Sequence, residues 1–203
     1  MIIDKDIVLV FLSTSATLIA VWIGHWLSES NRKKSAMQLE EAIYRELKIL
    51  SGYFKKTLPS LISAFNRSVV KEYRKVEDIN FRYVDASYIE FLRYGGTLTE
   101  EQVRGLHNLH CVMNGVYLQG NELDQNVEIV AGGLLLRKKY VASYIIHIID
   151  FIYLVEKFTS LKSEFDFDGF EVDSRKIKYV MGDFLQDGEL SSFVDEFIRV
   201  INE

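Results

Sequence analysis

The sequence predicts an all-α protein in which a single N-terminal transmembrane helix continues into a cytoplasmic antiparallel helical bundle. Three observations carry this prediction. Residues 7–27 hold no formal charge, and apolar positions recur every three or four residues from 36 to 69. Two later segments, 100–120 and 127–161, are also expected to be helical, the first with an apolar stripe and the second apolar nearly all round in its central part. We find no segment with the strict alternation of apolar and polar residues that a half-buried strand requires.

The uncharged segment 7–27 has the length of a membrane span. Twenty-one helical residues reach about 31 Å, which matches the hydrocarbon thickness of a bilayer at roughly 30 Å. The preceding hexapeptide "MIIDKD" carries two acidic residues against one lysine, whereas a secretory signal starts with a net positive segment. The segment therefore indicates an uncleaved signal-anchor.

Basic and aromatic residues at the end of this segment indicate its orientation. Positive residues next to a span stay on the cytoplasmic side, so we expect a single-pass protein of the inner membrane with its N-terminus outside. Indole and imidazole rings favour the lipid interface. The predicted lipid-interface residues are Trp22, His25, Trp26, Arg32, Lys33 and Lys34.

Small residues recur along one face of the predicted span. This small-xxx-small pattern lets two helix backbones approach each other within a bilayer, and it predicts a homo-oligomer. The alternative is that these side chains face lipid without consequence. The predicted interaction face comprises Ser13, Ala16, Thr17, Ala20 and Gly24.

Composition divides the chain into an anchor (1–34), a cytoplasmic helical bundle (35–162) and an acidic C-terminal helical segment (163–203). Beyond the anchor there are 20 basic and 26 acidic residues, a balance that excludes a typical nucleic-acid binder. The one cysteine, Cys111, cannot form an internal disulfide, which agrees with a reducing compartment.

Within the bundle, the first helix is expected to run over 36–73. Pro59 removes a backbone hydrogen bond, so we expect a kink or break between Phe54 and Pro59. A short helix is expected at 86–94, ending at the glycine pair that follows it.

The sequence gives its clearest local signal for the start of the next helix, at residue 100. Thr99 and Gln102 have the spacing of a capping box, which places a helix start at residue 100. Near the C-terminus, Asp173 is expected to cap a helix over 174–185. An Asp-Gly turn at 187–188 should separate that helix from a last one over 192–201.

Two groups of residues could carry chemistry. His107 and Cys111 lie four residues apart on one helix face and, with His147, form a weak candidate metal site; a closed zinc site needs four ligands, so we expect no metal and no cofactor. The segment 140–155 is too short for a second span. Its His147 and Asp150 are expected to form a buried polar pair.

These observations favour a non-enzymatic function. We expect a membrane-anchored interaction or regulatory protein that binds membrane lipid, other copies and an unknown protein partner, with aromatic residues of the acidic segment (Phe165, Phe167 and Phe170) available for docking. The layout resembles that of small bacterial single-span proteins, some of which act in phage exclusion or defence; the resemblance covers layout alone. Alternatives are a membrane-perturbing effector or its immunity partner, and a metal-dependent enzyme using the His107, Cys111 and His147 region.

Overall fold

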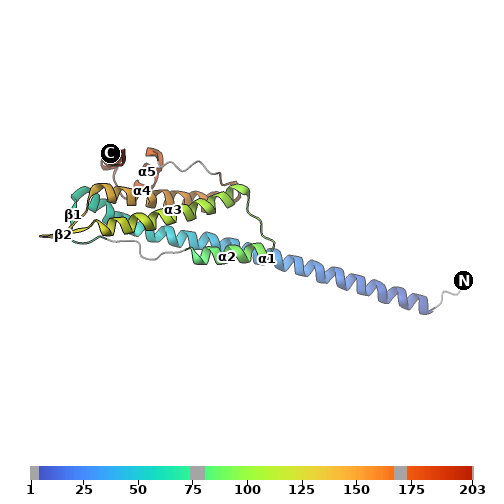
Figure 1. The fold of residues 1–203 in the computed structure, drawn as a ribbon. Helices are drawn as coiled ribbons and strands as arrows, with labels where there is room; N and C mark the ends of the chain where they lie inside the picture. The colour runs from blue at the N-terminus through green and yellow to red at the C-terminus, as the bar shows by residue number, and fades with distance from the viewer. Residues whose placement is uncertain (1–4, 74–80, 167–172, 203) are drawn as a thin grey trace. The chain divides into compact units, whose positions relative to one another are not determined.

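The computed structural model describes residues 5–73, 81–166 and 173–202, with side chains described from residue 18 onward (Figure 1). This part of the chain is mostly helical, which confirms the predicted all-α class. The helices are α1 (Lys5–Arg67), α2 (Arg82–Arg93), α3 (Glu100–Gln125), α4 (Lys138–Leu161), the 3-10 turn η1 (Lys162–Glu164), α5 (Ser174–Met181) and α6 (Asp187–Asn202). The described residues also form three short strands: β1 (Val69–Val70), β2 (Glu128–Val130) and β3 (Gly133–Leu135).

The chain divides into two compact units, and α1 contributes to both. The first unit comprises Met1–Ile43 with Asp85–Thr97, and the second comprises Tyr44–Val84 with Leu98–Glu203. In the first unit, Phe91 of α2 is buried, whereas every described α1 side chain from 18 to 27 is exposed. Among the described residues, none of the helices combines the length and the apolar character that a membrane crossing requires.

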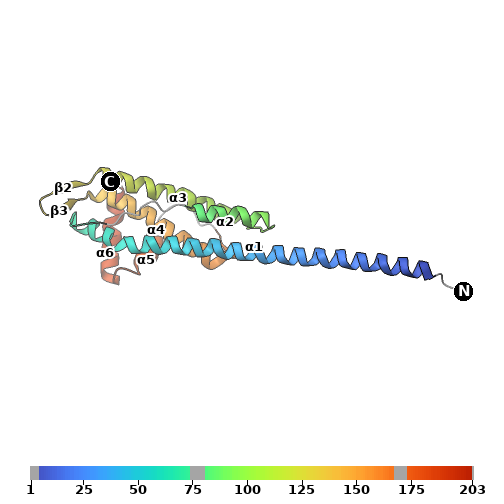
Figure 2. The same cartoon turned by 90° about the horizontal axis from the view of Figure 1, so that it is seen from below.

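The core of the second unit is organised around α4. Figures 1 and 2 show α3 and α4 side by side, and their connection through a hairpin makes them antiparallel. α1 also packs on α4: Phe151 of α4 contacts Phe54 of α1, with ring centroids 4.6 Å apart. α5 and α6 also contact α4, and Phe65 of α1 forms an aromatic cluster with Phe193 and Phe197 of α6. α4 is therefore covered by four helices, which explains its nearly uninterrupted apolar sequence.

The start of α3 is fixed as the sequence predicts. The Thr99 hydroxyl accepts a hydrogen bond from the Gln102 amide, and the Gln102 side chain accepts one from the Thr99 amide at 2.8 Å. The Gln102 amide group also donates to the buried Tyr44 hydroxyl at 2.9 Å. The capping box thus joins the first turn of α3 to α1 as well as starting the helix.

A small antiparallel sheet, with strand order β1-β3-β2, was not predicted from the sequence. Val69 pairs with Leu135, and Glu128 pairs with Leu135 on its other side. Gly133 has a φ of +154°, and a Cβ at this position would lie 2.3 Å from the Val70 carbonyl oxygen. Only glycine permits this approach, because any side chain would collide with the β1 backbone. The expected helix over 127–161 is therefore wrong at its start: β2 and β3 occupy its first residues, and α4 begins at Lys138.

Of the expected kink or break between Phe54 and Pro59, the break is wrong, because α1 continues through Pro59 to Arg67, and the kink stays a prediction. Pro59 lies on the exposed face, while the neighbouring Phe54 and Leu58 are fully buried. The Thr57 hydroxyl donates to the Tyr53 carbonyl, and the Ser60 hydroxyl donates to the Thr57 carbonyl. Packing on both sides of the proline holds the helix together where its backbone bonding is weakest.

The C-terminal helices follow the prediction in part. Asp173 caps α5 by accepting a hydrogen bond from the Lys176 amide, as expected. However, α5 ends at Met181, and the predicted Asp-Gly turn at 187–188 forms the first turn of α6. An acidic residue in a first helical turn interacts favourably with the helix dipole, so Asp187 suits a helix start as well as a turn.

Candidate functional site

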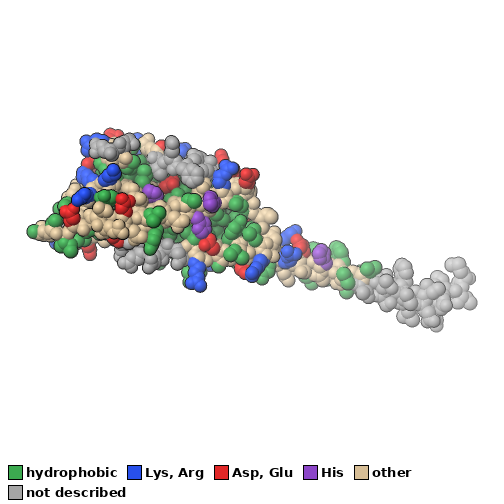
Figure 3. All heavy atoms as spheres, in the orientation of Figure 1, with side chains coloured by type: hydrophobic (Ala, Val, Ile, Leu, Met, Phe, Trp, Pro, Cys, Tyr) green, Lys and Arg blue, Asp and Glu red, His purple; other side chains and the backbone are tan. Residues whose placement is uncertain are grey.

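Residues 18–27 of α1 form an exposed and largely apolar length of helix (Figure 3). Seven large apolar side chains between residues 18 and 27 are between 44% and 68% exposed. They are Leu18, Ile19, Val21, Trp22, Ile23, Trp26 and Leu27. Because they spread over about two thirds of the helix circumference at 100° per residue, no single packing partner on one side would cover them all.

The predicted small-residue face lies partly within this exposed segment. Ala20 and Gly24 are exposed, and a Cβ at Gly24 would have no atom within 4 Å. The side chains of Ser13, Ala16 and Thr17 lie outside the described residues. The open space around Gly24 is compatible with close approach by another helix.

The predicted lipid-interface residues are all exposed as well. Trp22, His25 and Trp26 lie within the apolar segment, and three consecutive cations follow: Arg32, Lys33 and Lys34. The Arg32 guanidinium lies within the first unit, with its Nη2 atom 3.5 Å from the position of a Cβ on Gly95.

The candidate metal ligands are only partly brought together. Cys111 Sγ lies 3.8 Å from His107 Nε2 on the exposed side of α3, as their spacing predicted. The ring of His147 on α4 packs directly on α3, because a Cβ on Gly115 would lie 2.4 Å from His147 Cδ2. Within 18–73, 81–166 and 173–201, no group of three or more His, Cys, Asp or Glu side chains could hold a metal ion.

His147 and Asp150, the predicted polar pair, each have another partner in the structure, and a contact between the two stays a prediction. His147 is half-buried, and its Nδ1 atom lies 2.8 Å from the Ser143 carbonyl oxygen one turn earlier. Asp150 is buried and faces the ammonium of Lys176 on α5 at 3.6 Å. This Lys176 side chain is 1% exposed, and its ammonium also lies 5.3 Å from the ring centroid of Tyr153.

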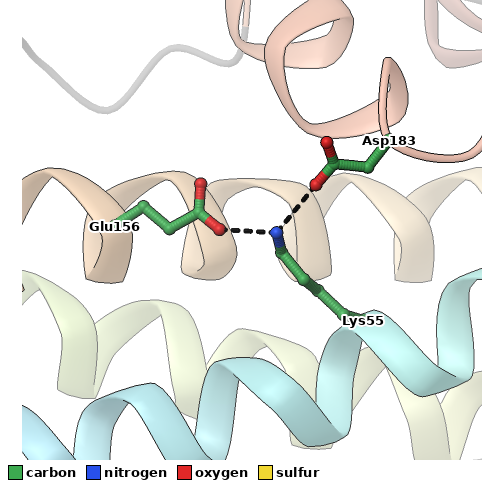
Figure 4. Close-up of polar contacts among 3 residues, drawn as sticks. All are labelled: Lys55, Glu156 and Asp183. Atoms are coloured by element: carbon green, nitrogen blue, oxygen red, sulfur yellow. Dashed lines mark hydrogen bonds and ion pairs between the residues drawn. The ribbon is translucent and has the colours of Figure 1, made fainter.

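A second charged cluster joins three segments of the bundle (Figure 4). The Lys55 ammonium of α1 lies 2.7 Å from a Glu156 carboxylate oxygen of α4 and 2.8 Å from one of Asp183, just after α5. Tyr179 of α5 packs edge-on against Tyr153 of α4. Together with the Asp150–Lys176 pair, this cluster fixes α5 against α4.

The cluster alters the protonation of two of its members. Burial lowers the pKa of Lys55, but hydrogen bonds to Asp183 and Glu156 outweigh it, so that the pKa is raised. Burial and the negative charge of Glu156 raise the pKa of Tyr179. Both shifts favour the protonated forms, which makes Lys55 a stable cation and Tyr179 a neutral hydrogen-bond donor. These are structural roles.

The predicted docking aromatics need a correction. Phe165 is 3% exposed and packs edge-on against Phe158 of α4, 5.2 Å between ring centroids. It also fills the space above Gly105 of α3, where a Cβ would lie 2.7 Å from its ring. Phe165 is therefore a core residue and is not available for docking. Phe167 and Phe170 lie outside the described residues.

Sequence reasoning missed the cations that pair with the acids of α4. One signal for Lys176 was available: Asp150 lies in an apolar helix and needs a partner, since burying an isolated charge is costly. The positions of the lysines and arginines in the sequence do not show which of them pairs with Asp150. Lys55 carries no comparable signal, because its partners are 101 and 128 residues away.

Comparisons with known proteins identify no relative: no family model matches the chain, and no similar curated protein or solved structure was found.

Proposed function

We propose that this protein is a membrane-anchored, non-enzymatic interaction protein. Residues 7–27 of α1 would form the anchor, and the helical bundle would bind a protein partner at the inner face of the membrane. The exposed apolar segment of α1 carries this proposal. A helix that is apolar on every side is stable only when it is covered, and lipid covers all sides of a helix at once.

The charge pattern supports the proposed orientation. The uncharged run ends at Leu27, and the exposed cations at Arg32, Lys33 and Lys34 follow it within seven residues. Such cations remain on the cytoplasmic side of an inner membrane. The bundle, which follows them, would therefore face the cytoplasm.

The single exposed cysteine permits a direct topology experiment. A membrane-impermeant maleimide applied to intact spheroplasts should leave Cys111 unlabelled, whereas permeabilised spheroplasts should be labelled. The matched control is Cys111→Ser combined with Lys5→Cys, which should be labelled without permeabilisation. Labelling of Cys111 in intact spheroplasts would reverse the proposed orientation.

The anchor itself is tested by charge insertion. We expect Leu18→Arg with Val21→Arg to release the protein from carbonate-washed membranes, because each arginine near a helix centre costs about 2.5–3.5 kcal/mol in a bilayer. Ile129→Arg, which changes a side chain that is 89% exposed on β2, is the control and should stay in the membrane fraction. Equal distribution of both variants would exclude the anchor.

We also propose that the span self-associates through its small-residue face. Gly24→Leu would fill the space that a second helix needs, so the detergent-solubilised variant should dissociate at least tenfold more readily. Ile19→Leu is a volume-conserving control on a different face. Sedimentation in detergent measures both variants, and a wild-type monomer would exclude self-association. Growth arrest on expression that depends on Gly24 would instead support a membrane-perturbing effector.

A further inference from the structure

The turn that ends α2 has a fixed conformation. The amides of Gly95 and Gly96 donate to the carbonyls of Leu92 and Phe91, each at 3.0 Å, which is the paired bonding of a Schellman motif. Gly95 has a φ of +74°, a conformation that favours glycine. A Cβ on Gly96 would lie 2.2 Å from the Phe91 ring, which is itself buried. The turn therefore cannot move away from Phe91 without losing this packing.

The same turn lies beside the cations that follow the proposed anchor. Arg32 Nη2 comes within 3.5 Å of the Cβ position of Gly95, so the turn lies within the reach of one arginine side chain from the level of Arg32 along α1. Arg32 is five residues beyond Leu27, or about 7.5 Å along a helix. A bilayer has about 5–7.5 Å of headgroup region on each side of its hydrocarbon. The turn therefore lies at headgroup depth if the anchor ends at Leu27.

The side chains around the turn suit that depth. Leu92 is 49% exposed and Tyr94 is 42% exposed, although Leu92 directly follows the buried Phe91. Tyrosine is favoured at lipid interfaces, where its ring meets acyl chains and its hydroxyl meets water. We define the collar as the five exposed residues Arg32, Lys33, Lys34, Leu92 and Tyr94.

The charge around the collar is positive. Its three cations are consecutive on α1, and the acidic residue that precedes them in the sequence, Glu29, is half-buried. On α2, Glu90 is already bonded to Arg93 at 2.6 Å, so these two charges cancel. Each basic residue near an anionic membrane surface favours binding by about fivefold.

We propose that the collar is a binding site for anionic phospholipid headgroups, with the cations binding phosphate and with Leu92 and Tyr94 entering the interface. The proposal rests on the proposed anchor, which sets the depth. It gives α2 a role that the anchor does not require: the turn is a second membrane contact that fixes how the first unit meets the lipid surface.

The experiment uses the full chain in lipid nanodiscs, either of phosphatidylcholine alone or of an equimolar mixture with phosphatidylglycerol. An environment-sensitive fluorophore is attached at Tyr94→Cys in a Cys111→Ser background. The matched control carries the label at Ala86→Cys, an exposed position at the other end of α2. We expect the label at 94 to shift to shorter wavelength in the anionic discs, and the label at 86 to remain unchanged.

A third variant tests the cations. Arg32→Gln, Lys33→Gln and Lys34→Gln together should abolish the shift at 94 while the protein still co-elutes with the discs. Equal emission in both kinds of disc, or a shift that survives the triple substitution, would overturn the collar and leave the anchor intact. Failure of the unsubstituted chain to co-elute with either disc would overturn the anchor, and the collar with it.

Discussion

The two parts of α1 differ in where their apolar side chains lie around the helix. Between residues 18 and 27 its large apolar side chains are exposed around most of the helix, whereas Phe54, Leu58, Leu61 and Phe65 are fully buried. The second part alternates these buried residues with exposed polar ones, such as Lys48 and Lys56. The contrast shows that apolar content alone does not reveal where a helix is buried; the distribution of polar residues around the helix does.

The largest effect expected from this comparison concerns burial. Phe54→Ala should lower the free energy of unfolding by about 3–5 kcal/mol, because it removes a buried ring and its contact with Phe151. Trp22→Ala removes a larger side chain that is 68% exposed, and should change this free energy by less than about 0.5 kcal/mol. Denaturant unfolding of the detergent-solubilised chain, followed by circular dichroism, measures both. Similar losses would mean that the N-terminal segment is part of the folded core.

A somewhat smaller effect is expected for the buried charge pair. Lys176→Met should destabilise the bundle by about 3 kcal/mol, since it leaves Asp150 buried without its cation. Adding Asp150→Leu should recover most of this loss, because the pair is then replaced by apolar packing. The same unfolding measurement applies. A double variant as unstable as the single one would show that the pair is not the source of the loss.

Glycine substitutions compare a crowded position with an open one. Gly115→Ala should cost about 1–3 kcal/mol, because its Cβ would collide with the His147 ring. Gly52→Ala on α1 has nothing within 4 Å and should stabilise the helix by about 0.5–1 kcal/mol. Thermal unfolding separates the two, and a stabilising Gly115→Ala would show that His147 moves aside freely.

The smallest effect is a dependence on alkaline pH. Lys55 and Tyr179 have raised pKa values, from ordinary values of 10.5 and 10.0. The unfolded chain loses these protons first, so the stabilisation is complete below about pH 10 and is lost as pH rises through the folded pKa values. Asp183→Asn should flatten this loss. Because both groups are partly exposed, the effect should stay below about 1 kcal/mol in unfolding experiments. A loss confined to acidic pH would contradict this assignment.

The sequence predicted those elements whose signals are local. The capping box at Thr99 and the cap at Asp173 were identified correctly, since each depends on residues within three positions. The sheet was missed because its strands are two or three residues long and have no resolvable alternation. Its local signal was the Gly132–Gly133 pair, which is typical of a hairpin turn.

Interactions between distant segments could not be predicted in the same way. The proximity of His107 and Cys111 follows from helical spacing, whereas the partner of Asp150 depends on how α5 docks on α4. The burial of Phe165 likewise depends on distant segments and could not be predicted from its neighbours in the sequence. Its acidic neighbours suggested an exposed segment, but the space above Gly105 buries its ring.

The small sheet has a consequence for the order of folding. β2 and β3 join across a two-residue turn, and the α3–α4 hairpin around them consists of contacts between neighbouring segments. Pairing Val69 with Leu135, in contrast, closes a loop of more than sixty residues. Closing a long loop costs more chain entropy, so this pairing should follow the local hairpin. β1 would then pair with the free edge of β3 after the β2–β3 hairpin has formed, as a late step in the folding of the bundle around α4.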